Sequence, residues 1–162
     1  MIEIKKVGPE AVPVIKNLAN IIWPLTYSEI ITPQQVDYMM ELMYSSSALK
    51  KQFEKGQQFI IAYEDEKPVA FASYSPKENS PSIYHLHKIY ILPNMQGRGI
   101  GKKLISYIQK DIAPADALQL NVNRHNKALQ FYQRIGFKII ADVDTNIGND
   151  FYMNDYVLEM KC

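Results

Sequence analysis

The sequence predicts an α+β fold in which helices pack against a mixed, mostly antiparallel sheet of about seven strands. Seven apolar runs have the length of strands, and they are spread from the N-terminus to the C-terminus. Between them lie segments whose apolar residues recur at helical spacing. A charged turn, residues 64–68, separates two of the strand-like runs and predicts a hairpin.

Composition narrows the class of protein. The chain has 162 residues, of which 47% are apolar, and the 18 basic and 17 acidic residues leave a net charge of +1. We expect a single domain, residues 1–162, in contact with neither nucleic acid nor a membrane. The only cysteine, Cys162, excludes an internal disulfide and a cysteine-based zinc cluster. The N-terminus lacks the apolar core of a signal peptide, so we expect a cytoplasmic enzyme or binding domain.

The N-terminal third is predicted to hold one strand and three helices, at residues 2–7, 9–22, 33–43 and 47–55. Pro9 suits an early position in the first helix. Thr32 is a good N-cap for the second helix, with Gln35 as its partner in a capping box. Gly56 is expected to end the third helix.

The remaining chain alternates strands and helices. Strands are predicted at residues 58–63, 69–75, 83–92, 117–122, 137–143 and 151–160, with a polar loop over 76–81. A helix over 101–112 presents one apolar face and is stopped by Pro114. Asn123 is expected to cap a further helix that runs to residue 135 and ends at Gly136.

The segment from Gln96 to Gly101 joins the long strand to a helix and contains three glycines. Glycine lets the backbone approach a ligand closely, and the helix that follows offers free N–H groups to phosphate oxygens. A Walker loop is excluded because position 96 is Gln and position 103 is Lys. A dinucleotide fingerprint is also disfavoured, because Lys102 stands where the third glycine is required. A glycine-rich turn without a ligand is the remaining alternative.

This turn and a second segment together resemble the GNAT superfamily of acetyl-CoA-dependent N-acetyltransferases. The second segment runs from Asn123 to Phe137 and includes Asn126 and the pair Phe131-Tyr132. The resemblance covers the whole chain and implies a central strand pair, 83–92 and 117–122, that splays apart. The segments 23–27 and 151–155 are similar, more weakly, to a bacterial branch that includes spermidine acetyltransferases of the PaiA type.

The resemblance implies acetyl-CoA as cosubstrate and no metal. The pyrophosphate would be held by the backbone of Gln96, Gly97, Arg98, Gly99, Ile100, Gly101 and Lys102, and the pantetheine arm by Ile89, Tyr90, Ile91 and Asn126. Arg98 and Lys102 could add positive charge. A solvated side chain on a turn is the other interpretation of Arg98.

Three residues are candidates for proton transfer. Tyr132 matches the family tyrosine that protonates the departing thiolate, although it also belongs to an apolar helical stripe typical of a core. His85 and His87 are candidate general bases, because imidazole accepts protons near neutral pH and two neighbouring imidazoles lower each other's pKa. Strand alternation predicts that His85, His87, Ile89 and Ile91 share one face. Ordinary strand residues near a cleft are the alternative for the histidines.

The acceptor side of the cleft is expected to use aromatic and acidic residues, which suit a cationic amine. The candidates are Trp23, Tyr27, Glu29, Tyr152 and Asp155. The resulting hypothesis is acetyl transfer to a primary amine, with a small amine or polyamine favoured, by direct attack in a ternary complex. Acetylation of a protein N-terminus or lysine, and a non-catalytic coenzyme A-binding module, are the alternatives. Many members of the family pair, so a homodimer is one expected assembly.

Overall fold

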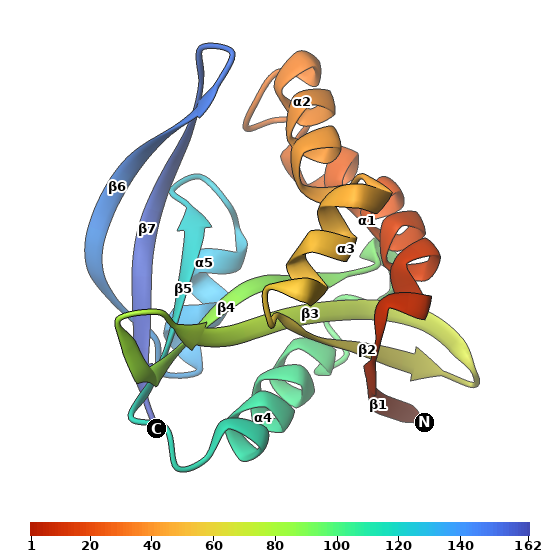
Figure 1. The fold of residues 1–162 in the computed structure, drawn as a ribbon, viewed down its shortest axis with the longest axis vertical. Helices are drawn as coiled ribbons and strands as arrows, with labels where there is room; N and C mark the ends of the chain where they lie inside the picture. The colour runs from red at the N-terminus through yellow and green to blue at the C-terminus, as the bar shows by residue number, and fades with distance from the viewer.

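The computed structural model describes residues 1–162, and its seven strands form one twisted sheet in the order β1-β2-β3-β4-β5-β7-β6 (Figure 1). The strands are β1 (Ile2–Val7), β2 (Gln58–Glu64), β3 (Lys67–Lys77), β4 (Ser80–Ile91), β5 (Ala117–Asn123), β6 (Lys138–Gly148) and β7 (Phe151–Lys161). Only β4 and β5 are parallel, and every other neighbouring pair is antiparallel. The predicted mixed, mostly antiparallel sheet is confirmed.

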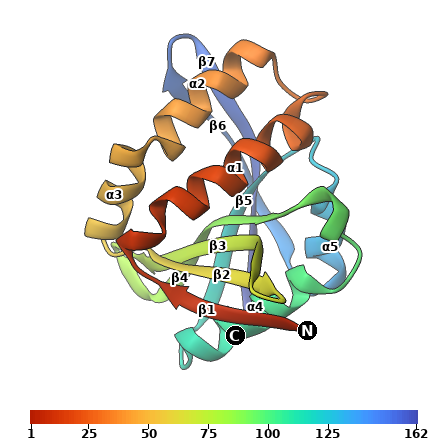
Figure 2. The same cartoon turned by 90° about the vertical axis from the view of Figure 1, so that its right-hand side faces the viewer.

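Five α-helices flank this sheet. They are α1 (Val12–Tyr27), α2 (Pro33–Tyr44), α3 (Ser46–Glu54), α4 (Ile100–Ile112) and α5 (Ala128–Arg134), with short 3₁₀ turns η1 (Pro9–Ala11) and η2 (Pro93–Met95). The first three helices cover one face of the β1–β4 region, and α4 lies on the opposite side (Figures 1 and 2). None of the helices is long and apolar enough to cross a membrane.

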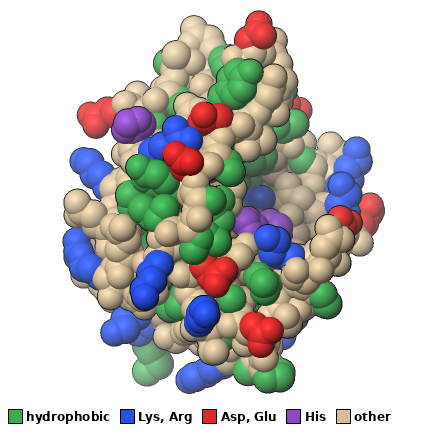
Figure 3. Space-filling model, turned by 90° about the vertical axis from the view of Figure 1, so that its left-hand side faces the viewer, with side chains coloured by type: hydrophobic (Ala, Val, Ile, Leu, Met, Phe, Trp, Pro, Cys, Tyr) green, Lys and Arg blue, Asp and Glu red, His purple; other side chains and the backbone are tan.

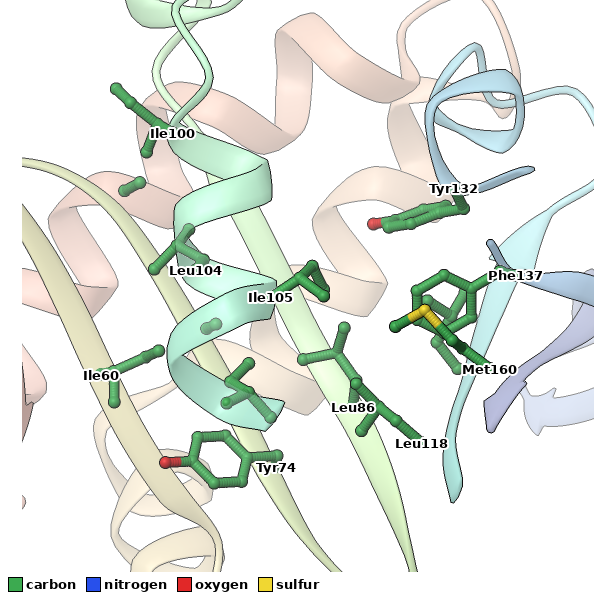
Figure 4. Packing of buried hydrophobic residues seen from close by; sticks show 14 of the residues in the cluster. Ile60, Tyr74, Leu86, Ile100, Leu104, Ile105, Leu118, Tyr132, Phe137 and Met160 are labelled. Atoms are coloured by element: carbon green, nitrogen blue, oxygen red, sulfur yellow. The ribbon is translucent and has the colours of Figure 1, made fainter. Parts of the chain in front are cut away.

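Two hydrophobic cores, one on each face of the sheet, explain the continuous apolar runs 59–62 of β2 and 69–72 of β3. On β2, Phe59 and Ile61 pack under α1–α3, whereas Ile60 and Ala62 pack against α4. Side chains that alternate along a strand therefore all find apolar surroundings. Figure 4 shows the second core, in which Leu104 and other residues of α4 meet the sheet.

The parallel pair β4 and β5 separates after a short stretch of pairing. The strands are in register only from Ile83 opposite Ala117 to Leu86 opposite Leu120. Beyond this point β4 stays with β3, and β5 stays with β7. Backbone groups of β4 that point away from β3 between residues 87 and 91 therefore have no strand partner, as the family resemblance implied.

A β-bulge in β4 changes the direction of the side chains that follow. Tyr74 of β3 lies opposite Leu86, but its neighbour Ser73 lies opposite Lys88, so His87 is the extra residue. A bulge of this kind reverses the alternation of side chains along the strand. Two consecutive residues, His87 and Lys88, consequently line the same cavity.

The expectation that His85, His87, Ile89 and Ile91 share one face is therefore wrong. The two histidines line the cavity on the α1–α2 side, whereas Ile89 and Ile91 pack against the α4 core. Tyr90 takes the place on the cavity side that alternation assigned to the isoleucines. The sequence carried no bulge signal such as a glycine in this strand.

Several element boundaries differ from the prediction, and the strand expected over 137–143 extends to Gly148 as β6. The first helix continues past Ile22 through an exposed Pro24 to Tyr27. The loop expected over 76–81 is only a two-residue turn, because β3 and β4 extend into it. The helix expected from Asn123 begins at Ala128, because Asn123 accepts a hydrogen bond from the His125 N–H and forms a local turn instead.

Candidate active site

A cavity of about 220 Å³ opens at the point where β4 and β5 separate. Its walls come from α1, α2, β4, β5 and β7, and its lining includes Trp23, Tyr27, Tyr44, His85, His87, Lys88, Tyr90, Asn121, Asn123, Tyr152 and Asp155. Figure 3 shows this side of the molecule, with histidine side chains gathered in a hollow. The cavity brings together residues that lie more than a hundred positions apart in the sequence.

The β6–β7 hairpin is clasped to α2 at one side of this cavity. Tyr38 donates a hydrogen bond of 2.6 Å to the Ile147 carbonyl, and Gln35 donates one of 2.7 Å from Nε2 to the Tyr152 carbonyl. The Thr32 hydroxyl accepts from the Gln35 N–H, as expected of the N-cap. The Gln35 side chain, however, holds the hairpin and does not complete a capping box.

Aromatic side chains form the inner wall. Trp23 donates from Nε1 to the Tyr44 hydroxyl at 3.1 Å, and the hydroxyls of Tyr27 and Tyr90 lie 2.9 Å apart. Burial raises the pKa of Tyr27 to about 12 and those of Tyr44 and Tyr90 well above their usual value. All three phenols are therefore neutral. Trp23 and Tyr27 are placed at the cavity, whereas Glu29 lies in the exposed turn after α1, outside it.

The two histidines of β4 lie side by side, with ring centroids 4.8 Å apart. Burial, followed by repulsion from Lys77, lowers the pKa of His85 to about 4. For His87, burial and then repulsion from His85 and Lys88 lower the pKa to about 3. The exposed surface of His87 faces the cavity, and its Nε2 lies 2.6 Å from the Ser75 hydroxyl. Both imidazoles are neutral at pH 7.

Lys88 is the cavity residue that sequence reasoning missed. Its side chain is 7% exposed, and its Nζ lies 5.2 Å from the centre of the Tyr44 ring. Burial lowers its pKa to about 8, so the ammonium persists at neutral pH. No carboxylate forms an ion pair with it. Regular alternation of side chains along β4 would put Lys88 on the opposite face from the histidines. The one sequence feature that could have indicated a role was the presence of a lysine within an apolar strand.

Asp155 of β7 is the carboxylate of the cavity and is 4% exposed. Burial raises its pKa to about 6; Arg124 acts to lower the value and Asp144 to raise it. Arg124 itself is paired with Asp144 at 2.7 Å. Tyr152 of the same strand is 48% exposed and also lines the cavity.

The glycine turn lies at the other end of the gap between β4 and β5. Gly97 and Gly99 have φ angles of +78° and +79°, a left-handed conformation that strains other residues. The first helical bond of α4 runs from the Lys103 N–H to the Gly99 carbonyl, and no side chain caps the helix. The Gln96 N–H bonds the Pro93 carbonyl, whereas the N–H groups from Gly97 to Lys102 are free to bind an anion, as phosphate recognition requires.

Gly101 has a different role from the other two glycines. A Cβ at this position would lie 2.9 Å from Cζ of Phe131 in α5. The absence of a side chain therefore lets α4 and α5 pack closely. This contact links the two sequence segments on which the family resemblance rests.

The side chains around the turn are mostly engaged within the protein. Arg98 forms an ion pair of 2.8 Å with Glu64, and Gln96 donates from Nε2 to the Ile91 carbonyl at 3.3 Å. Ile100 is buried in the core, whereas Lys102 is exposed at the start of α4. The turn can therefore hold phosphates through its backbone, with Lys102 as the free positive charge.

Tyr132 is 6% exposed and packs edge-on against Phe137. Figure 4 shows that its hydroxyl points away from Phe137 and Met160, and it makes no hydrogen bond within the protein. Burial raises its pKa, so the phenol keeps its proton. Asn126 uses its Oδ1 to accept from the Ala128 N–H, and its side chain also lies beside the Tyr27 hydroxyl.

These features define an acyl-coenzyme A-dependent transferase. Free N–H groups in the glycine turn suit a pyrophosphate, and the unpaired edge of β4 suits the amides of pantetheine. Acetyl-CoA supplies the acetyl thioester. The described residues hold no group of three or more His, Cys, Asp or Glu side chains arranged to bind a metal.

Comparison with known proteins agrees with this class. The profile of the acetyltransferase (GNAT) domain matches residues 28–153, and the chain belongs to this family. Spermidine N(1)-acetyltransferase of Thermoplasma acidophilum is 27% identical over 160 residues, which cover 94% of this chain and 95% of that protein. Peptidyl-lysine N-acetyltransferase YjaB of Salmonella typhimurium is 29% identical over 82 residues, half of each chain.

Solved structures show the same fold. PaiA N-acetyltransferase from Thermoplasma acidophilum, in complex with coenzyme A, superposes with a TM-score of 0.84 at 23% identity and covers 100% of this chain and 99% of its own. The ribosomal-protein-S18-alanine N-acetyltransferase of Escherichia coli has a TM-score of 0.74 at 14% identity, covering 99% of this chain and 94% of its own. The protein is thus an N-acetyltransferase that uses acetyl-CoA.

Proposed function

We propose that the protein acetylates the primary amine of a small molecule held in the cavity between α1, α2, β4 and β7. The observation that carries this proposal is the clasp of the β6–β7 hairpin onto α2 through Gln35 and Tyr38. A protein substrate would bring the residues that flank its lysine or N-terminus, and these need an open groove. The clasp narrows the groove on the side of α2 and the β6–β7 hairpin. The cavity volume of about 220 Å³ suits a small molecule instead.

The roles proposed for the site residues follow from proton transfer. The amine must lose a proton, and the departing thiolate of coenzyme A must gain one. Tyr132 is the proposed acid, because its phenol is neutral, buried and free of internal hydrogen bonds. Burial raises the pKa of this phenol above its ordinary value near 10, so proton transfer to a thiolate with pKa about 8.5 requires direct contact between the phenol and the departing sulfur.

His87 and His85 are the proposed route for the proton that leaves the amine. They are neutral and line the cavity, and His87 is exposed to solvent and hydrogen-bonded to the Ser75 hydroxyl, so the pair reaches from the cavity to the surface. Their lowered pKa values make them weak proton acceptors, so the role we propose is to pass the proton on to solvent and not to hold it. Asp155, the carboxylate in the cavity lining, is the residue we propose to attract the ammonium form of the acceptor.

Two of the relatives favour different classes of acceptor. The spermidine N(1)-acetyltransferase of Thermoplasma acidophilum matches nearly the whole chain and supports a polyamine. The peptidyl-lysine acetyltransferase matches only half of it. A small amine, with polyamines as one class to test, is therefore favoured over a protein substrate.

A panel of acceptors tests this proposal. Spermidine, diamines, amino acids and lysine-containing peptides are each supplied with acetyl-CoA, and release of free coenzyme A is measured. We expect turnover of at least one small amine at a higher kcat/KM than any peptide. Preference for a peptide, or no turnover of any amine, would contradict the proposal.

A further inference from the structure

The ammonium of Lys88 is the most unusual charge in the molecule, because it is buried in the cavity without an anionic partner. The side chain is 7% exposed, and none of the ion pairs in the structure includes it. Its one favourable contact is the face of the Tyr44 ring, 5.2 Å from Nζ. A cation–π contact recovers only part of the hydration that a buried ammonium loses.

The surroundings of Lys88 are fixed and do not supply an anion. The Tyr44 hydroxyl accepts a hydrogen bond from Trp23, and Tyr44 is fully packed in the core. The bulge at His87 directs Lys88 into the cavity and away from solvent. The strand thus presents a positive charge to whatever occupies the cavity.

The charges of the cavity are divided between two walls. Lys88 comes from β4, and Asp155, the one carboxylate in the lining, comes from β7 across the gap. The buried titratable groups that complete the lining are the two neutral histidines and the neutral phenols of Tyr27, Tyr44 and Tyr90. A ligand with one positive and one negative end would meet complementary charge at both walls.

We propose that the acceptor carries an oxyanion group, a carboxylate or a phosphate, in addition to its primary amine, and that Lys88 binds this group while Asp155 attracts the amine. The inference rests on the proposed function and narrows its acceptor class. A polyamine would bring a further cation against an ammonium that has no counter-ion, so the structure favours a zwitterionic acceptor.

A series of primary amines on the same short chain tests the proposal. γ-Aminobutyrate and aminopropylphosphonate carry a carboxylate and a phosphonate, butylamine ends in a methyl group, and putrescine ends in a second ammonium. We expect an oxyanion-bearing amine to have the highest kcat/KM. The two oxyanion arms distinguish a carboxylate from a phosphate site. Higher kcat/KM for putrescine or spermidine would overturn the proposal while leaving the proposed function intact.

Substitution of Lys88 tests whether its charge causes the preference for oxyanion-bearing amines. Lys88→Met keeps an unbranched apolar stem, and we expect it to lower kcat/KM for γ-aminobutyrate at least about tenfold, because a charge-assisted contact is lost. Butylamine should change by less than about twofold, and Lys88→Arg should retain part of the preference. Lys50→Met, on the exposed face of α3, is the matched control for loss of one positive charge. An equal fall for γ-aminobutyrate and butylamine would overturn the proposal, because it would place Lys88 in proton transfer.

Binding measured without turnover separates the two proposals. Calorimetry of γ-aminobutyrate and aminopropylphosphonate with the coenzyme A-saturated protein should give binding that Lys88→Met weakens. If no amine is acetylated but this binding is seen, the proposed function fails and the anion site stands. If neither oxyanion binds better than butylamine, the anion site is wrong.

Discussion

The two halves of the site recognise their ligands by different means. The cosubstrate half, formed by the glycine turn, the start of α4 and the unpaired edge of β4, presents backbone groups. The acceptor half presents side chains from α1, α2, β4 and β7. Backbone recognition depends on local conformation, so it can be conserved in a short motif, whereas side-chain recognition depends on how distant strands are registered. The cosubstrate half is therefore a family feature, and the acceptor half belongs to this chain.

Replacement of Tyr132 by Phe tests whether the two halves meet at this residue. We expect kcat to fall about 100-fold, which is about 2.7 kcal/mol in the barrier, because the thiolate would leave without its acid. Binding of acetyl-CoA should be nearly retained, since the ring still packs against Phe137. Steady-state kinetics and calorimetry measure the two quantities. Tyr84→Phe, a β4 tyrosine outside the cavity, is the control. Unchanged turnover would show that Tyr132 is a core residue only.

Gly101→Ala tests whether the third glycine serves packing and not the ligand. The new Cβ would approach Cζ of Phe131, so we expect a loss of about 1–3 kcal/mol in the free energy of unfolding. A second substitution, Phe131→Leu, should make the Ala less costly. Denaturant unfolding of the single and double variants gives the coupling energy. Additive effects of the two substitutions would contradict the packing role.

The pH dependence of kcat/KM tests whether Asp155 on β7 or the histidines on β4 control binding of the acceptor. Because the pKa of Asp155 is raised to about 6, its carboxylate is lost as pH falls through 6, and kcat/KM should fall with it. His85 and His87, with pKa values near 4 and 3, stay neutral from pH 5 to 8, and Lys88 titrates near 8.

Asp155→Asn should therefore abolish the acidic limb and lower kcat/KM at pH 7.5 about tenfold, equivalent to about 1.4 kcal/mol. His85→Gln and His87→Gln should leave the midpoint of that limb in place. A midpoint that moves in either histidine variant, and not in Asp155→Asn, would make a histidine the titrating base.

Gly148→Ala tests the clasp that closes the acceptor half. A Cβ there would lie 2.6 Å from the Tyr38 hydroxyl, and the residue also has φ +92°. Gly56→Ala is a matched control, because Gly56 has φ +94° and no neighbour within 4 Å. We expect Gly148→Ala to cost about 1 kcal/mol more than Gly56→Ala, since it also displaces the Tyr38 hydrogen bond.

The same variant should raise KM for small amines without changing the affinity for acetyl-CoA. Equal unfolding free energies for the two variants, with unchanged KM, would remove the clasp as a determinant of acceptor binding.

The order of elements and the cosubstrate half could be read from the chain because their determinants are local. Gly97 and Gly99 are required by the φ angles of their own residues, and Thr32 caps a helix that begins beside it. The strands of the sheet were found because apolar runs bounded by turn residues have few other solutions.

Other features could not be predicted from the sequence, also for physical reasons. Gln35 has a sequence signature for a capping box, yet its side chain bonds the Tyr152 carbonyl, more than a hundred residues away. Asn123 forms a local turn where a helix start was expected. In both cases two polar partners compete at similar energies, and only the folded arrangement decides between them.

The sequence by itself determined the family, the cosubstrate and the turn that holds it, because glycine conformation and helix termini are properties of a few consecutive residues. The tertiary structure alone decided the face on which the β4 side chains lie. One extra residue in that strand placed Lys88 beside the histidines and turned Ile89 and Ile91 toward α4. Strand register depends on pairing with a partner strand, so a single bulge changes the charge of the acceptor cavity without any mark in the local sequence.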